Sequence, residues 1–87
     1  MEQTVECWLA EIARAIVDKP EQVRVRRVGG DRCVLIEISV AKEDIGKIIG
    51  KKGRTIGAIR TILVAVREQK YRRYILELLD DHGYRRD

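Results

Sequence analysis

The sequence has no phenylalanine and few aromatic residues of any kind. Its 87 residues include one tryptophan, three tyrosines, one histidine and two cysteines, and aromatic residues make up 5% of the chain. No apolar stretch approaches the roughly 18 residues of a membrane-spanning helix, so we expect no membrane partner. With 45% hydrophobic and 37% charged residues, the chain has the composition of a globular protein. Its length allows one domain with a small core.

The cysteines and the histidine fit no metal or redox site. Cys7 and Cys33 match no zinc or dithiol spacing, and we expect both to be buried as small hydrophobic residues. His82 lies in Asp80-Asp81-His82-Gly83, which we expect to be a solvated end. The sequence therefore predicts no metal and no cofactor. Met1 to Thr4 lack the basic and apolar regions of a secretion signal, so we expect a cytoplasmic protein.

Positive charge is concentrated in one part of the chain. Residues 47–73 contain nine basic residues and one acidic residue, a net charge of +8 within a total of +4. The remaining residues therefore carry a net charge of −4. Such a segment is a candidate surface for a polyanion, and the alternative is the solvated exterior of a charged helix.

The first part of the sequence predicts a helix and then two strands. Apolar residues recur at helical spacing from Thr4 to Asp18, with Thr4 as the N-cap and Trp8 as a core or interface anchor. Pro20 discourages helical geometry at the residue before it, so the helix should end near there. Alternation then predicts strands over residues 23–26 and 33–40, joined by a turn at 29–31.

A third strand is predicted over residues 74–79. One face of the sheet should pack against the helices. The other face should carry Leu35, Ile75 and Leu79, which makes it a candidate dimer contact.

Gly50-Lys51-Lys52-Gly53 is the stretch with the clearest chemistry. Glycine accepts positive φ and lets a ligand approach the backbone, while the lysines bring positive charge. A short apolar helix is expected before it, over 44–49, and a longer amphipathic helix should begin near Arg54 and continue toward residue 70. The N-terminus of that helix favours anions. Together these features predict a phosphate-binding turn.

The residues from Ile48 to Ile56 resemble the KH-domain signature, in which an aliphatic pair precedes Gly-x-x-Gly and another aliphatic residue follows. The resemblance extends over the whole chain to small stand-alone bacterial KH proteins. It implies an α+β fold of type II KH order, α-β-β-α-α-β, with three helices on one face of a three-stranded mixed sheet. Residues 1–87 would form a single KH domain, with the N-terminal helix and strand at 4–28, the minimal motif at 33–80 and a short tail at 81–87.

The resemblance also implies a cytoplasmic protein that binds single-stranded RNA, with about four nucleotides along the groove beside the turn. We expect an RNA chaperone or post-transcriptional regulator. The alternative is an assembly protein that acts through a homodimer or through pairing with a second, larger KH protein. The predicted RNA-binding residues are Gly50, Lys51, Lys52, Gly53, Arg54, Lys47, Ile45 and Ile49. The three residues named last are candidates for the groove that holds the bases, although both isoleucines could equally be ordinary core.

An enzyme is not expected. A P-loop needs four residues between its glycines and then Lys-Ser/Thr, whereas Gly46 and Gly50 enclose three and Lys51 precedes another lysine. The four aromatic residues also exclude an extensive platform for base stacking, so binding at a single site should be weak.

Overall fold

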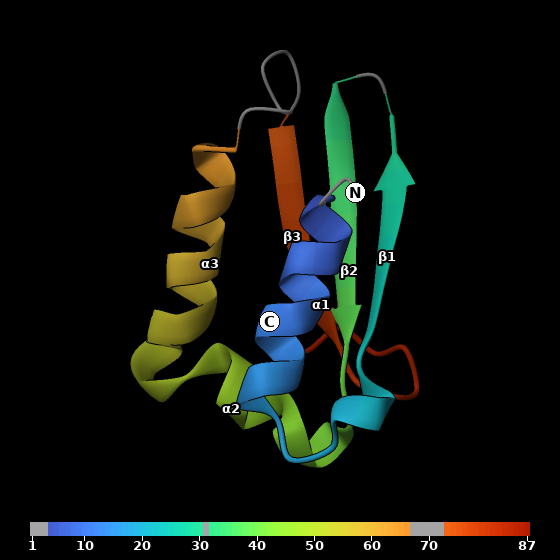
Figure 1. The fold of residues 1–87 in the computed structure, drawn as a ribbon, viewed down its shortest axis with the longest axis vertical. Coiled ribbons are helices and arrows are strands. Elements are labelled where there is room, and N and C mark those ends of the chain that lie inside the picture. Colours follow the sequence, from blue (N-terminus) through green and yellow to red (C-terminus); the bar gives the residue numbers. More distant parts are fainter. Residues whose placement is uncertain (1–3, 31, 67–72) are drawn as a thin grey trace.

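The computed structural model describes residues 4–30, 32–66 and 73–87 (Figure 1). Within these ranges, three α-helices cover one face of a three-stranded sheet, which confirms the predicted α-β-β-α-α-β order. The helices and strands are α1 (Val5–Ile16), β1 (Arg24–Gly29), β2 (Cys33–Ser39), α2 (Ile45–Ile49), α3 (Arg54–Val64) and β3 (Arg73–Leu79). Short 3-10 turns connect them: η1 (Pro20–Gln22), η2 (Lys42–Asp44) and η3 (Lys51–Gly53).

Strand β2 lies in the centre of the sheet. It pairs antiparallel with β1, from Arg24 opposite Ser39 to Gly29 opposite Val34. It pairs parallel with β3, from Cys33 opposite Arg73 to Ser39 opposite Leu79. A parallel pair requires a crossover connection, and the segment containing α2 and α3 supplies it. This crossover places the turn between α2 and α3 at one end of the sheet (Figure 1).

The core lies between the sheet and the helices. Alternate residues of β2 and β3 point inward, and the apolar stripes of the helices cover them. Full burial of one such side chain contributes about 1.5–3 kcal/mol. Trp8 is partly buried against the same cluster, as predicted. The buried apolar side chains of the cluster include Leu9, Ala13, Val34, Ile36, Ile38, Ile48, Ile56, Ile59, Leu63, Leu76 and Leu78.

Helix α1 begins as predicted and ends slightly earlier. The Thr4 hydroxyl accepts a hydrogen bond of 3.1 Å from the Cys7 amide, so Thr4 is the N-cap. The last helical residue is Ile16, and Pro20 opens η1 after an extended connection.

The cysteines correct one sequence prediction. Cys7 and Cys33 are both exposed and free, whereas burial was expected. Cys7 lies two residues after the buried Val5, which places it on the solvent side of α1. Cys33 is at the start of β2 and belongs to the outward set of that strand.

Helix α3 is shorter than its apolar pattern indicated. It ends at Val64, and residues 67–70 of the predicted helix lie outside the described residues. Ile62 belongs to the sequence pattern but is 46% exposed. Val66 still packs against the core after the helix has ended.

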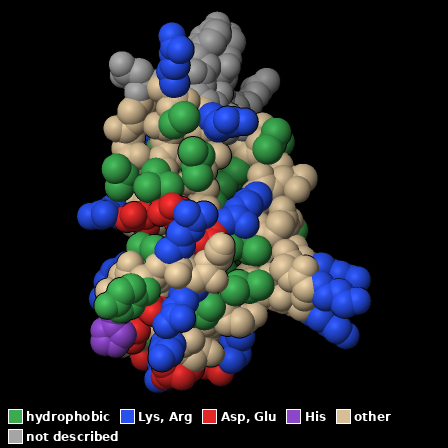
Figure 2. Space-filling model, turned by 180° about the vertical axis from the view of Figure 1, so that it is seen from behind, with side chains coloured by type: hydrophobic (Ala, Val, Ile, Leu, Met, Phe, Trp, Pro, Cys, Tyr) green, Lys and Arg blue, Asp and Glu red, His purple; other side chains and the backbone are tan. Residues whose placement is uncertain are grey.

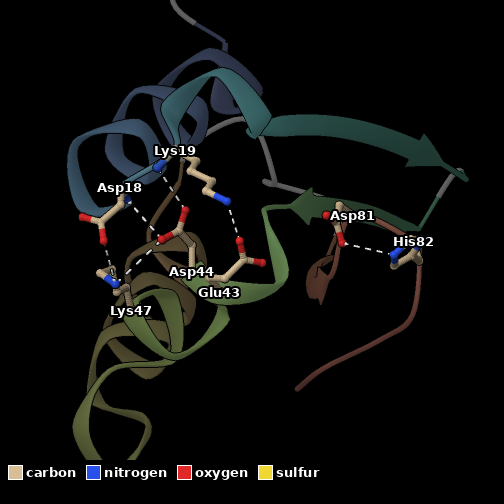
Figure 3. A network of polar contacts seen from close by, with 7 residues as sticks. All are labelled: Asp18, Lys19, Glu43, Asp44, Lys47, Asp81 and His82. Atoms are coloured by element: carbon tan, nitrogen blue, oxygen red, sulfur yellow. Dashed lines mark hydrogen bonds and ion pairs between the residues drawn. The ribbon is translucent and has the colours of Figure 1, made fainter.

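A buried carboxylate joins α1 to the start of α2 (Figure 3). Asp44 is 1% exposed, and its side chain accepts hydrogen bonds of 3.2 and 3.1 Å from the amides of Asp18 and Lys19. Lys19 also forms an ion pair with Glu43. These contacts fix the entry to α2, and with it the turn that follows.

Candidate functional site

The turn between α2 and α3 has a backbone that only certain residues can adopt. Gly50 has φ 77° and ψ 170°, a region open essentially to glycine. An ideal Cβ at Gly50 would also lie 2.7 Å from Thr55 Cβ and 2.8 Å from the Thr55 amide nitrogen. Lys52 and Gly53 follow in the left-handed region, with φ 58° and 74°. The sequence Gly-Lys-Lys-Gly is therefore matched to this geometry.

Three basic residues lie in the turn or directly after it. Lys51, Lys52 and Arg54 are exposed, and none of them forms an ion pair with any residue that the structure describes. The turn lies at a lower corner of the molecule, where Figure 2 shows a group of basic side chains projecting into solvent. Their charges are therefore available to an anionic ligand.

The backbone amides at the start of α3 are partly used within the turn. The Gly53 amide donates to the Gly50 carbonyl at 3.1 Å, and the Arg54 amide donates to the Lys51 carbonyl. Both amides lie at the N-terminus of α3, which the sequence predicted to favour anions. In this conformation the anion-binding capacity of the turn therefore rests chiefly on its side chains and on the positive end of the α3 dipole.

Helix α2 carries the three residues predicted to form the groove for the bases, but it directs them to different surroundings. Ile45 and Ile49 are one helical turn apart and partly buried. Each packs against the core and also exposes part of its side chain to solvent. Lys47 points toward the connection that follows α1, and its Nζ lies 3.1 Å from Asp18 Oδ2 there (Figure 3). The same Nζ lies 3.8 Å from Oδ1 of Asp44, the residue before α2. The hydrogen bond to Asp18 raises the pKa of Lys47 above its ordinary value. Lys47 is thus held away from the cations of the turn.

Arg60, one of the nine basic residues of the segment 47–73, lies on the helix that follows the turn. Arg60 of α3 reaches the edge of β3, where its Nη2 donates to the Leu76 carbonyl at 2.9 Å. A cavity of about 460 Å³ lies beside it, between α3 and β3. The amphipathic pattern of α3 could have placed Arg60 on the polar side of that helix. Its contact with Leu76 could not be predicted in this way, because it depends on where the parallel pairing places β3.

Two other kinds of feature are absent from the part of the chain that the structure describes. It contains no group of three or more His, Cys, Asp or Glu side chains that could hold a metal ion. In the same residues, no helix is long and apolar enough to cross a membrane.

Comparison with known proteins gives a consistent result. The family model described as KhpA/KhpB, KH domain matches residues 6–78. The protein named RNA-binding protein KhpA from Chlamydia pneumoniae is 51% identical over 74 residues, which cover 85% of this chain and 95% of that protein. Proteins with the same name from Treponema pallidum and Clostridium acetobutylicum are 44% and 41% identical over 72 and 71 residues. These matches cover 83% and 82% of this chain, and 90% and 95% of the two proteins.

Proposed function

Because the chain belongs to the KhpA/KhpB family of KH domains, we propose that it binds RNA, and specifically single-stranded RNA gripped at the Gly50–Gly53 turn. The relatives carry RNA binding in their names. The observation that supports the site most strongly is the pairing of a glycine-dependent backbone with three cations that have no acidic partner among the described residues.

In this proposal, the turn holds the RNA backbone while α2 supports the bases. Gly50 and Gly53 let a phosphate approach, and Lys51, Lys52 and Arg54 neutralise its charge. The partly buried Ile45 and Ile49 would offer apolar surface to one or two bases. Lys47 would join them only by leaving its ion pair with Asp18.

Salt should weaken this binding strongly. With about three or four phosphates neutralised, log affinity for a single strand should fall against log salt with a slope of about −2 to −3. Fluorescence anisotropy with a short labelled oligonucleotide, measured from low to moderate salt, gives the slope. A response that is flat with salt would contradict a grip on phosphates.

A duplex of the same sequence is the matched control for that titration. Its bases are locked in an A-form helix and cannot lie against Ile45 and Ile49, so the duplex should bind more weakly. Equal affinity for duplex and single strand would indicate attraction by charge alone.

We propose a cytoplasmic RNA chaperone or post-transcriptional regulator, with no catalytic role. Weak binding at one site suits a protein that must release its RNA. It also favours association with a second RNA-binding unit, because linked sites raise the overall affinity.

Pairing with another protein is a second candidate function, favoured by the outer face of the sheet. Val28 and Ile75 are 44% and 42% exposed, and the partly exposed Leu35 lies between them. Leu79 is partly exposed farther along β3. Figure 2 shows apolar side chains spread over this face with charged ones among them. A second copy of the chain could cover this surface.

Ile75→Lys should then weaken a dimer at least tenfold, because it places a charge on the apolar face. Sedimentation equilibrium measures the dissociation constant. The control is Ile62→Lys, at a similarly exposed position of α3 on the opposite side of the sheet. A dimer that Ile62→Lys disrupts and Ile75→Lys does not would exclude the sheet face.

A further inference from the structure

The segment after β3, residues 80–87, folds back along the outer edge of that strand, and we call it the C-terminal strap. The Asp80 amide donates to the Tyr84 carbonyl at 2.9 Å, and the Arg86 amide donates to the Leu78 carbonyl at 2.8 Å. Leu79 and Arg85 form an antiparallel bridge. In Figure 1 the strap leaves the lower end of β3, loops outward and returns toward the middle of the molecule.

Asp80 holds the strap in this turn. Its side chain is 1% exposed and accepts hydrogen bonds from the amides of His82 and Tyr84, at 2.9 and 3.0 Å. Arg86 completes the arrangement, with its Nη2 2.8 Å from Asp80 Oδ2. A buried carboxylate that accepts this many hydrogen bonds gives the strap a defined conformation, although residues 81–87 are themselves exposed.

The side chain of Asp87 also fixes the strap, because several hydrogen-bond donors converge on its carboxylate. Its carboxylate pairs with Arg60 of α3, accepts from the Leu78 amide at 3.2 Å, and lies 3.3 Å from Arg85 Nε. The side chain is 4% exposed. Burial alone would raise the pKa of Asp87, but the Leu78 amide and the charge of Arg60 outweigh it and lower that pKa. The group is therefore an anion at neutral pH.

Residues of the strap line two cavities. On one side, Arg86 and Ile45 line a small cavity of about 160 Å³ together with Lys42. On the other side, Asp87 and Arg60 line the larger cavity between α3 and β3. RNA that leaves the turn and passes over Ile45 toward β3 would meet this segment.

We propose that the strap occupies one end of the RNA groove, with the Asp87 carboxylate on Arg60 in the place of an RNA phosphate, and that bound RNA displaces it. This inference rests on the proposed function. A guanidinium pairs with phosphate as it does with carboxylate, so Arg60 becomes a fourth cation for RNA once Asp87 leaves. The family match ends at residue 78, so the strap lies outside the part of the chain that defines the family.

Asp87→Asn in the full chain tests the proposal. It keeps the shape of the side chain and removes the charge that holds Arg60, so affinity for a short single-stranded RNA should rise at least threefold. Asp81→Asn is the matched control, since Asp81 is in the same strap and its ion-pair contact is with His82. That variant makes the same change in net charge and should bind like the wild type. Adding Arg60→Gln to Asp87→Asn should abolish the gain.

A second readout follows the strap itself. In the wild type, RNA should shift the amide resonances of Leu78 and Arg86, whose N–H groups form the hydrogen bonds between β3 and the strap. Equal gains for the two asparagine variants, or RNA binding that leaves these two resonances unmoved, would overturn the inference while the proposed function stands. No binding by the wild type and by Asp87→Asn would overturn both.

Discussion

Replacing Lys51 and Lys52 together with aspartate should lower the affinity for single-stranded RNA at least tenfold and leave thermal unfolding unchanged. The double change reverses four units of charge where a phosphate would bind. The new carboxylates would also compete with RNA for the positive end of the α3 dipole. A tenfold loss corresponds to about 1.4 kcal/mol of binding free energy.

The fold should tolerate this change for local reasons. Both side chains are exposed, and substitutions at such positions usually change stability by no more than about 0.5 kcal/mol. Lys52 has φ 58°, in the left-handed region that aspartate adopts more readily than most residues. Acidic residues near a helix N-terminus are also favourable.

The comparison requires melting, sedimentation and RNA affinity in one buffer. Arg14→Asp with Arg32→Asp is the control, because it reverses the same amount of charge at exposed positions away from the turn. Equal losses for the two double variants would assign binding to net charge. Wild-type affinity in the Lys51 and Lys52 variant would place the grip elsewhere.

Gly50→Ala should destabilise the protein by about 2–6 kcal/mol, more than Gly53→Ala in the same turn. Positive φ with extended ψ costs about 1–3 kcal/mol for a residue with a side chain. The added methyl group would also press on Thr55, whose Cβ and amide nitrogen lie within 2.8 Å of it. Overpacking of this kind costs about 1–3 kcal/mol.

Gly53→Ala is the matched control for that prediction. Gly53 also has positive φ, but a Cβ there would meet no atom within 4 Å. Only the left-handed backbone is then unfavourable, at about 1–2 kcal/mol. Urea unfolding of the two variants measures the difference. Equal losses would show that the contact with Thr55 does not constrain Gly50.

The sequence predicted most of the fold because local patterns and topology agreed. Alternation in β2 and β3 identified the inward residues, and the two helices between these strands supplied the crossover that a parallel pair requires. The prediction for the cysteines was wrong because residue type was used without position, whereas Cys7 lies on the solvent side of its helix. Ile62 shows the same limit, since its place in the apolar pattern did not bury it.

The sequence predicted the turn of the candidate site, but it did not predict the contacts of the residues around that turn. Gly-Lys-Lys-Gly indicated both the turn and its charge, but the sequence could not show that Asp18 holds Lys47. It also could not place Arg60 beside β3 or bring Asp87 to it, because both contacts join elements far apart in the chain. Residues 81–87 are exposed, as expected for a solvated end, but the sequence did not show that they are also hydrogen-bonded to the strand edge.

The most direct test of RNA binding at the turn is an NMR titration of the ¹⁵N-labelled protein with a short single-stranded RNA. The account predicts the largest amide shifts at residues 50–56 and at Ile45 and Ile49, with little change at the outward residues of β1. Large shifts on β1 and the outer sheet face, with the turn unmoved, would contradict it.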